Sequence, residues 1–331
     1  MGTVKKPRFD VLSHFLLSQI KIHKQYGGVF PQLAQREHQR NLIPILKKTL
    51  KEAGEEKAAK KHFKTDAATK IMKILERESE LLFHFLKYVP TIARPKIDAI
   101  AVTSGPGLEP ALWVGINFAK ALGVMWNVPV IPINHMEGHL VSVLLGEKGG
   151  EVPTSHRQSS RVETGVFLKF PMIALLVSGG HTELVFSKKW GSYKVVGETR
   201  DDAVGEAFDK VARMLELPYP GGPQISGLSE AHRKAIETSN VYKLPRPMIH
   251  SGDLDFSFAG LKTAVLYTLK KIKVINAEAK QTIAREFEDA VIEVLISKTK
   301  QALKKYKAKS LIVGGGVIAN TALRRALTYL E

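Results

Sequence analysis

A chain of 331 residues is long enough for about two domains, because single hydrophobic cores rarely grow beyond about 250 residues. Its composition, 44% apolar and 24% charged, is typical of a folded globular protein and argues against disorder. The absence of cysteine excludes disulfides, thiolate metal sites and cysteine nucleophiles, and it leaves His, Asp and Glu as candidate metal ligands. We find neither an apolar stretch of membrane-spanning length nor a signal-peptide pattern, so we expect a cytoplasmic protein.

The formal net charge of +17 is distributed unevenly along the chain. Residues 1–98 hold 20 Lys/Arg against 10 Asp/Glu, residues 270–331 hold 13 against 6, and residues 99–269 hold 16 of each. A neutral centre between basic flanks suits a small-substrate pocket beside a surface that binds a phosphate backbone. Lysine-rich helix faces in water would give the same pattern, so charge alone leaves both interpretations open.

Helical patterns dominate the N-terminal part of the chain. A glycine-containing turn at 25–31 precedes helical spacing over 33–50. In the segment 55–94, Thr65 or Asp66 is placed to cap an amphipathic helix, and we expect an inserted helical segment on the surface. Its apolar stripe consists of Ile71, Ile74, Leu75, Leu82, Phe85, Leu86 and Val89.

From residue 97 the pattern changes to strands and glycine turns. Residues 97–122 and 310–330 each contain a strand-like run, a glycine turn and a helical pattern. Two such units in separate halves predict an α/β fold of duplicated domains, an N-terminal one over 1–134 and a C-terminal one over 135–331.

A pair of histidines forms a candidate metal site. His135 and His139 follow a strand-like run at 128–133 and lie four residues apart. On a helix these positions share one face, so both imidazoles can bind one divalent ion. Histidine pairs at this spacing are more often surface or packing residues, and a metal site needs at least one further donor. Glu137 does not follow the first histidine directly as in His-Glu-x-x-His, which disfavours a peptidase.

Two glycine turns have the composition of phosphate-binding loops. Residues 176–180, Leu-Val-Ser-Gly-Gly, lie in a predicted hairpin between strands at 172–177 and 182–186, and N–H groups in such a turn can approach phosphate oxygens. Gly-Gly-Gly at 314–316 precedes a helix, whose N-terminal dipole favours anions. Together the turns favour nucleotide binding, and Asn320 either contacts the nucleotide or caps the helix.

An acidic run at 199–210 begins another predicted helix. Asp202, Glu206 and Asp209 recur at spacings of four and three, which places three carboxylates on one helical face. Such a cluster is costly unless cations, hydroxyls or a ribose meet it, and we expect Asp209 to contact substrate and Asp201 to act as a cap. The string Phe-Ser-Phe-Ala-Gly-Leu-Lys-Thr at 256–263 suits a binding segment and a packed aromatic turn equally well.

Six strings together resemble the TsaD family and occur in the order found there. They are His-Met-Glu-Gly-His at 135–139, Leu-Val-Ser-Gly-Gly-His-Thr at 176–182, Asp-Asp-Ala-Val-Gly-Glu-Ala-Phe-Asp-Lys at 201–210, Tyr-Pro-Gly-Gly-Pro at 219–223, Phe-Ser-Phe-Ala-Gly-Leu-Lys-Thr-Ala at 256–264 and Gly-Gly-Gly-Val-Ile-Ala-Asn at 314–320. The resemblance extends to 19–36 and 104–122 and so covers most of the chain. Leu176 and the residues after it resemble the bacterial type of this family, whose members were formerly described as glycoproteases.

The resemblance implies an actin-like α/β fold of the sugar kinase and Hsp70 type with two duplicated domains. It implies an acyltransferase that moves threonylcarbamoyl from threonylcarbamoyl-adenylate to N6 of the adenosine next to the anticodon, in tRNAs that read codons beginning with A, and releases AMP. It implies a divalent ion on His135 and His139, with iron (Fe²⁺) favoured over zinc. The implied adenylate-binding residues are Leu176, Val177, Ser178, Gly179, Gly180, Asp209, Gly222, Ser226 and Asn320. The implied partners are tRNA, a TsaB-type paralogue and a TsaE-type ATPase.

Two features depart from the family pattern. Nothing before Gln19 resembles the opening strand and turn of the type Gly-Ile-Glu-Thr-Ser-Cys-Asp-Glu-Thr, and the sequence ends at Glu331, before the aspartate that serves the family as third metal ligand. The alternatives are a catalytically impaired remnant that binds nucleotide or partner proteins, and a small-molecule kinase of the same fold, for which no base and metal-carboxylate set is evident in the sequence.

Overall fold

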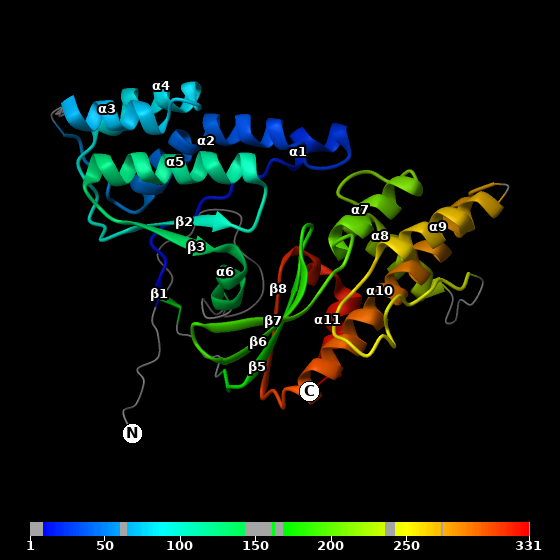
Figure 1. Cartoon of the computed structure of the whole chain (residues 1–331). Coiled ribbons are helices and arrows are strands. Elements are labelled where there is room, and N and C mark those ends of the chain that lie inside the picture. Colours follow the sequence, from blue (N-terminus) through cyan, green and yellow to red (C-terminus); the bar gives the residue numbers. More distant parts are fainter. Residues whose placement is uncertain are drawn as a thin grey trace. The chain divides into compact units, whose positions relative to one another are not determined.

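The computed structural model describes residues 9–59, 65–142, 161–162, 168–235, 242–272 and 274–330 (Figure 1). Its contacts divide the chain into two compact units. Unit 1 comprises Met1–His23 and Val29–Val166, and unit 2 comprises Lys24–Gly28 and Phe167–Glu331. Among the described residues that the sequence-based division placed in the second domain, His135–Ser142 and Arg161–Val162 thus fall in unit 1. Both units combine helices with strands, which confirms the predicted α/β class.

Unit 1 contains a parallel pair of strands covered by helices. β2 (Ile100–Gly105) pairs with β3 (Val130–Asn134), and α5 (Glu109–Trp126) connects the two strands. Helix α6 (His135–Ser142) starts directly after β3. The other elements of this unit are β1 (Phe9–Asp10), which pairs antiparallel with β4 (Arg161–Val162), α1 (Ile20–His23), α2 (Pro31–Glu52), α3 (Thr65–Ile74), α4 (Ser79–Tyr88) and the 3-10 turn η2 (Val89–Thr91).

The amphipathic stripe predicted near 71–89 is present, but it is divided between α3 and α4. Glu78, between the helices, has a non-helical backbone (φ −115°, ψ 60°), and its buried carboxylate accepts a hydrogen bond of 3.2 Å from the Asn117 side chain of α5. Phe85 of α4 meets Phe118 of α5 edge to face, with ring centroids 6.1 Å apart. Residues 60–64 of the predicted insertion lie outside the described residues. Four stripe residues are fully buried: Ile71, Leu75, Phe85 and Val89.

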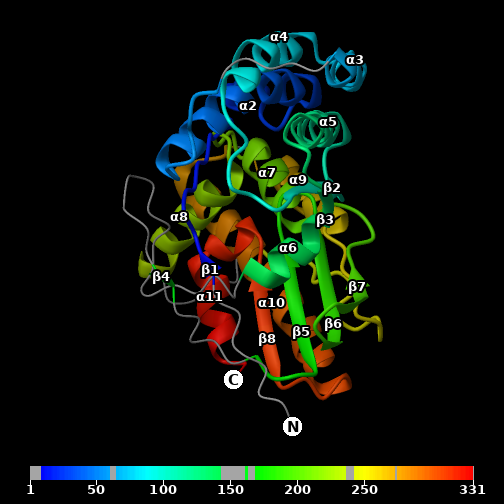
Figure 2. The same cartoon turned by 90° about the vertical axis from the view of Figure 1, so that its left-hand side faces the viewer.

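Unit 2 is built on a mixed sheet with the strand order β7-β6-β5-β8 (Figure 2). Every residue of β5 (Met172–Val177) is buried, and this strand pairs antiparallel with β6 (Thr182–Lys189) and parallel with β8 (Ser310–Gly314). The next strand beyond β6 is β7 (Ser192–Glu198). The unbroken apolar sequence of β5 is typical of a strand covered on both faces, and the predicted hairpin between β5 and β6 is confirmed.

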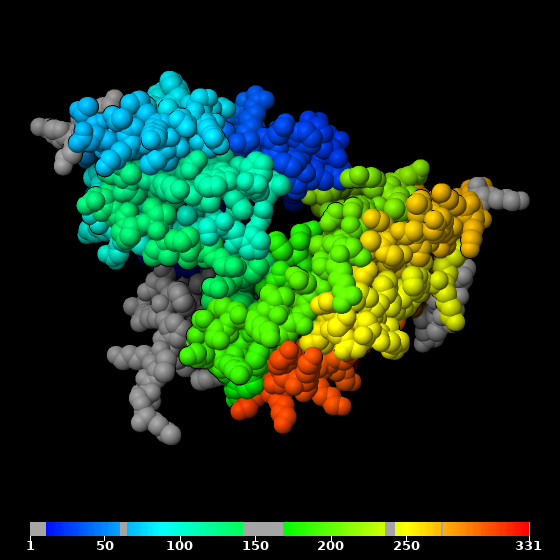
Figure 3. Space-filling model, viewed as in Figure 1, coloured from blue at the N-terminus to red at the C-terminus, as the bar shows by residue number. Residues whose placement is uncertain are grey.

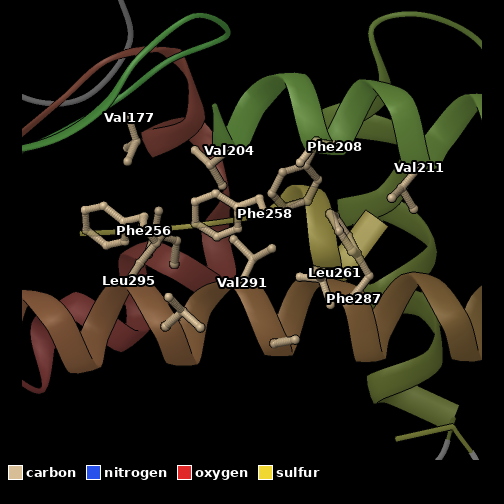
Figure 4. Close-up of a cluster of buried hydrophobic side chains, with 14 of the residues drawn as sticks. Val177, Val204, Phe208, Val211, Phe256, Phe258, Leu261, Phe287, Val291 and Leu295 are labelled. Atoms are coloured by element: carbon tan, nitrogen blue, oxygen red, sulfur yellow. The ribbon is translucent and has the colours of Figure 1, made fainter. Parts of the chain in front are cut away.

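Helices of unit 2 enclose an apolar core beside the sheet. α7 (Val204–Met214), α9 (Ala259–Lys271) and α10 (Ala277–Lys305) contribute most of the side chains in Figure 4. The Asn276 side chain caps α10 by accepting a hydrogen bond of 2.8 Å from the Ala279 N–H. Phe208 and Phe287 meet edge to face at 5.1 Å between centroids. The remaining elements are η1 (Lys24–Tyr26), α8 (Gly221–Ala235), η4 (Gly316–Ala319) and α11 (Thr321–Thr328).

The predicted elements differ from the observed ones mainly at their ends. The first strand of the strand–turn–helix unit begins at Ile100 rather than at 97, and the last helix spans Thr321–Thr328 within the predicted 319–330. Such shifts are expected because helix and strand ends depend on tertiary contacts. Within the described ranges, no helix combines the length and the apolar character that crossing a membrane requires.

The core of unit 2 predicts a clear difference between two aromatic substitutions. Phe287→Ala removes a fully buried ring and should lower the free energy of unfolding by about 3–5 kcal/mol. Tyr267→Ala on α9 removes a ring that is 58% exposed and should cost less than about 1 kcal/mol. Urea denaturation followed by circular dichroism measures both values, and equal losses would contradict this packing.

Candidate functional site

The carboxyl ends of β5 and β8 lie side by side, and each strand runs into a glycine turn. Leu176 pairs with Gly314 at the end of the parallel ladder. Ligands of open α/β sheets commonly bind at the carboxyl ends of the strands. The turns at 178–180 and 315–316 therefore lie next to each other at the carboxyl ends of these strands. This proximity is needed if both turns are to bind one nucleotide.

Gly315 and Gly205 allow a close approach of the chain at this edge. Gly315 has φ 95° and ψ 162°, a conformation essentially limited to glycine, and a Cβ there would be 2.2 Å from the Val177 carbonyl oxygen. Gly205 lies in the first turn of α7 and donates a hydrogen bond of 3.2 Å from its N–H to the Ser178 carbonyl oxygen. A Cβ at Gly205 would be 2.7 Å from that oxygen. Neither position has room for a larger residue.

The Ser178 side chain organises the turn after β5. Its hydroxyl oxygen accepts hydrogen bonds from the N–H groups of Gly180 (3.3 Å) and His181 (3.0 Å), and the Ser178 N–H donates to the His181 carbonyl at 2.8 Å. The turn is thus held by local bonds of Ser178, while its two glycines carry no side chain.

Asp209 connects α7 to the start of α8. Its carboxylate accepts a hydrogen bond of 2.7 Å from the Gly221 N–H and a further one from the Gly222 N–H. Burial raises the pKa of Asp209 above its ordinary value, although these bonds and the nearby Arg213 act in the opposite direction. A Cβ at Gly221 would be 2.5 Å from the Ala212 Cβ, so glycine is needed for this contact as well.

Asn320 and Ser226 lie beside an ion pair whose carboxylate is buried and whose arginine is partly exposed. The Asn320 side-chain oxygen accepts a hydrogen bond of 2.8 Å from the Leu323 N–H, so the capping role considered for Asn320 is present. The Asn320 amide nitrogen donates to Glu288 (2.5 Å) and to the Ser226 hydroxyl (3.4 Å). Glu288 is fully buried, and Arg233 binds its other oxygen at 2.5 Å.

Sequence reasoning missed Glu288 and Arg233. Glu288 lies on the buried face of α10 beside Ala284, Phe287 and Val291, so an acid within an apolar helical stripe was the available signal. A buried carboxylate requires a partner, but no local pattern identifies an arginine 55 positions away as that partner.

Four other glycines of this region have open space where a side chain would be. A Cβ added at Gly179, Gly180, Gly222 or Gly316 would meet no protein atom within 4 Å. Backbone groups at such positions can approach a ligand closely. Contacts of Val177 with Gly315, Ser178 with Gly205, Asp209 with Gly221, and Ser226 with Asn320 join all these segments. We name this set, residues 176–180, 205, 209, 221–222, 226, 315–316 and 320, the glycine ring.

The other acids of the predicted cluster bind lysines. Lys210 binds Asp202 at 2.6 Å and Glu206 at 2.8 Å, and Lys262 binds the second oxygen of Asp202 at 2.8 Å. Burial alone would raise the pKa of Asp202, but the hydrogen bonds from Lys210 and Lys262 lower it overall. Cations thus stabilise the acidic face, and Asp209 turns toward α8 instead.

The string at 256–263 forms an aromatic turn and the start of α9. Phe256 and Phe258 are fully buried and stack with centroids 6.2 Å apart. The Asp201 carboxylate accepts hydrogen bonds from the N–H groups of Phe258 (2.8 Å) and Ala259 (3.1 Å). The predicted cap is therefore present, but it serves α9 rather than the helix that follows Asp201 in the sequence.

The metal-ligand candidates His135 and His139 lie on α6 in unit 1. Asn134 caps this helix by accepting hydrogen bonds from the N–H groups of Met136 (2.9 Å) and Glu137 (3.2 Å). The two imidazole rings meet edge to face with centroids 4.6 Å apart, which fits two donors on one divalent ion. The described part of the chain holds no group of three or more His, Cys, Asp or Glu side chains placed for a metal, so this pair amounts to two candidate donors.

Comparison with known proteins places the chain in a family. The family model described as TsaD: tRNA N6-adenosine threonylcarbamoyltransferase matches residues 10–62, 90–156 and 152–331. The chain belongs to the TsaD family. It is 43% identical to a tRNA N6-adenosine threonylcarbamoyltransferase of Burkholderia lata and 44% identical to one of Burkholderia thailandensis, each over 324 residues, 96% of this chain and 76% of the relative.

Membership in the TsaD family agrees with the α/β architecture and with the actin-like fold that the resemblance implied. The TsaD match leaves out residues 63–89, the part that contains α3 and α4. The residues that the resemblance to TsaD assigns to the adenylate all belong to the glycine ring of unit 2. The two that it assigns to a metal lie together in unit 1.

Two adjacent glycines should respond differently to alanine. Gly315→Ala places a Cβ against the Val177 carbonyl in a conformation that alanine rarely adopts, so we expect a loss of at least about 2 kcal/mol in the free energy of unfolding. Gly316→Ala meets open space and should change this value by less than about 0.5 kcal/mol. Urea denaturation of the two variants compares them, and a stable Gly315→Ala protein would refute the close approach.

Proposed function

We propose that this chain transfers a threonylcarbamoyl group from threonylcarbamoyl-adenylate to N6 of the adenosine next to the anticodon, in tRNAs that read codons beginning with A, with release of AMP. The observation that carries the proposal is the TsaD match over most of the chain, together with relatives of that activity that are 43–44% identical over 96% of its length. The protein is accordingly an acyltransferase of tRNA modification.

The chemistry needs positioning rather than a protein nucleophile. The N6 amine attacks the carbonyl carbon of a mixed carbamic–phosphoric anhydride, the bond from that carbon to the phosphate oxygen breaks, AMP leaves with the electron pair, and the amine loses a proton to solvent. Holding both reactants in an attack geometry supplies a large part of the rate acceleration. Stabilisation of charge on the carbonyl oxygen supplies another part.

The glycine ring has the features that an adenylate site needs. Gly179, Gly180, Gly222 and Gly316 offer backbone without side chains, which allows a phosphate or a ribose to come close. The Asp209 carboxylate is a hydrogen-bond acceptor suited to ribose hydroxyls, and Gly221 and Gly222 hold it in place. The buried Glu288, which pairs with Arg233, fixes the Asn320 amide beside Ser226.

His135 and His139 would hold the divalent ion, Fe²⁺ or alternatively zinc, which when bound acts as a Lewis acid on a carbonyl oxygen. The Asn134 cap and the helical spacing keep both imidazoles on one face of α6. We also propose a TsaB-type paralogue and a TsaE-type ATPase as partners and the cytoplasm as the site of action, on the strength of the family alone.

The transfer reaction itself tests the proposal. The chain, supplied with synthetic threonylcarbamoyl-adenylate, unmodified tRNA and Fe²⁺, should yield the modified nucleoside, detected by mass spectrometry of digested tRNA. His135→Ala/His139→Ala should lower the rate by at least about a hundredfold, because two imidazole donors are lost. His84→Ala/His250→Ala also removes two imidazoles, both outside the glycine ring and α6, and as the matched control should keep the wild-type rate. Adenylate binding without transfer, with partners and metal present, would instead favour the nucleotide-binding remnant.

The raised pKa of Asp209 predicts how AMP binding depends on pH. Ribose hydroxyls donate to the ionised carboxylate, so the affinity for AMP should fall as the pH drops from neutral through the raised pKa of Asp209. Asp209→Asn should bind AMP about tenfold more weakly at neutral pH and lose this acidic dependence. Glu216→Gln changes a carboxylate whose side chain is 80% exposed, and this variant should keep the wild-type pH dependence of AMP affinity. Calorimetric titration at several pH values measures all three proteins, and a wild-type profile in Asp209→Asn would exclude the contact.

A further inference from the structure

Unit 2 contains a lysine-rich region that the proposed chemistry does not use. Three segments, 168–172, 186–194 and 300–310, contain no aspartate or glutamate. All their lysines are exposed: Lys169, Lys188, Lys189, Lys194, Lys300, Lys304, Lys305, Lys307 and Lys309. We name these nine residues the lysine end. They include five of the basic residues that make the C-terminal flank of the sequence positive.

The sheet brings these three segments together. Met172 at the start of β5 pairs with Ser187 of β6 on one side and with Ser310 of β8 on the other. The Lys309 N–H donates to the Pro171 carbonyl at 2.7 Å, and the Lys169 N–H donates to the Ser310 hydroxyl at 2.9 Å. In Figure 3 the orange-red atoms of the segment after α10 lie at the surface of unit 2, next to green atoms of the sheet.

Within the described residues, no carboxylate forms an ion pair with the lysine end. Lysines of unit 2 form ion pairs at Lys210, Lys234, Lys262, Lys280 and Lys298, and no described contact pairs a lysine of the lysine end with an acid. On neighbouring segments, Asp253 and Asp255 bind Arg200, and Asp253 also binds Lys298. Glu183 and Glu198 lie at the opposite end of the β6–β7 ladder. Among the residues that the structure describes, the positive charge of the lysine end therefore has no paired acid.

Helix stabilisation accounts for only part of this charge. Lys304 and Lys305 lie in the last turn of α10, where cations interact favourably with the helix dipole. Lys169, Lys188, Lys189, Lys194 and Lys309 lie on strands or in connections, where no helix end requires them. Closely spaced lysines repel one another, so the arrangement suits a bound polyanion better than the isolated unit.

Aromatic rings lie among the lysines. Trp190, in the turn between β6 and β7, is 43% exposed, and its ring meets Phe170 edge to face at 5.3 Å between centroids. Phe186 stacks on Tyr306 at 4.4 Å, which joins β6 to the end of α10. A supported, partly exposed tryptophan beside cations is the combination that single-stranded RNA-binding surfaces use to stack bases.

We propose that the lysine end is an RNA-binding surface, whose lysines bind backbone phosphates and whose Trp190 stacks on an unpaired base. The identity of the RNA as tRNA rests on the proposed function. The lysine end lies at the amino end of β5, whereas the glycine ring lies at its carboxyl end. Six residues of strand span about 20 Å, less than the length of the ~16 base pairs that double-stranded RNA-binding modules cover. One RNA molecule is therefore long enough to reach both ends of the sheet.

Affinity for unmodified tRNA, measured by fluorescence anisotropy at several salt concentrations, tests the proposal. Lys189→Gln/Lys304→Gln/Lys309→Gln in the full chain should raise Kd by about tenfold or more and should flatten the dependence of log K on log salt by about 2. Lys234→Gln/Lys270→Gln/Lys271→Gln removes three lysines elsewhere in unit 2 and should change Kd by less than about threefold. Circular dichroism confirms that both variants are folded.

Several outcomes would overturn the inference. Equal affinity of the first variant and the wild type would do so, as would equal weakening by both triple variants. Binding of the wild type to vesicles of anionic phospholipid but not to RNA would assign the lysines to a membrane surface instead.

Transfer assays on the same samples separate this inference from the proposed function. If the wild type transfers the group and the triple lysine variant binds tRNA with unaltered affinity, the lysine end is not an RNA-binding surface, but the proposed function stands. If tRNA binding depends on these lysines and the wild type shows no transfer, the RNA-binding surface is supported and the proposed transferase function is rejected.

Trp190 has its own test. Trp190→Ala should weaken binding of a single-stranded oligoribonucleotide by about fivefold or more with an unchanged salt dependence, because stacking involves no counterion release. Trp190→Phe should retain most of the affinity, since it keeps an aromatic face. Wild-type affinity in Trp190→Ala would remove base stacking from the proposal.

Discussion

Parallel pairing of β5 with β8 is the constraint on which the described features of unit 2 depend. The two strands are far apart in the sequence, yet their ladder fixes Leu176 opposite Gly314 and Met172 opposite Ser310. At the carboxyl end, the ladder puts the turn of Ser178 beside Gly315, and α7 and α8 join through Gly205 and Asp209. At the amino end, the same ladder gathers lysines from three segments. One set of backbone hydrogen bonds thus positions the glycine turns at the carboxyl end of the two strands and the lysine end at their amino end.

A buried polar network holds the second half of the glycine ring. Glu288 has no exposure to solvent, and its two oxygens are engaged by Arg233 and by the Asn320 amide. Arg233 also binds Asp289 on the next residue of α10. Charges taken out of water are tolerated when their hydrogen bonds are complete, and loss of one partner leaves an unpaired charge. The network therefore positions Asn320 at the start of α11 more strictly than a cap alone would.

Local patterns in the sequence were sufficient for most elements and for the two glycine turns of the glycine ring, whereas Gly222 and Ser226 came only from the resemblance to the TsaD family. The apolar run of β5, the helical spacing of α2 and the glycine turns each depend on neighbouring residues, so their prediction was correct within a few positions. Partners distant in the chain could not be predicted. Asp201 caps a helix that begins 58 positions later, and Glu288 meets an arginine 55 positions earlier, because the fold and not the local sequence selects these contacts.

The helices α3 and α4, which fall outside the family match, have a consequence for how unit 1 is assembled. Their buried stripe covers α5, whose side chains Val114, Phe118 and Trp126 are themselves buried in the same cluster. A chain without α3 and α4 would expose apolar side chains of α5, the helix that connects β2 to β3. Exposed apolar patches of this kind promote self-association. A variant that lacks α3 and α4 would therefore need polar substitutions on the covered face of α5 to stay in solution. The sequences of the two helices and of α5 are linked for this reason.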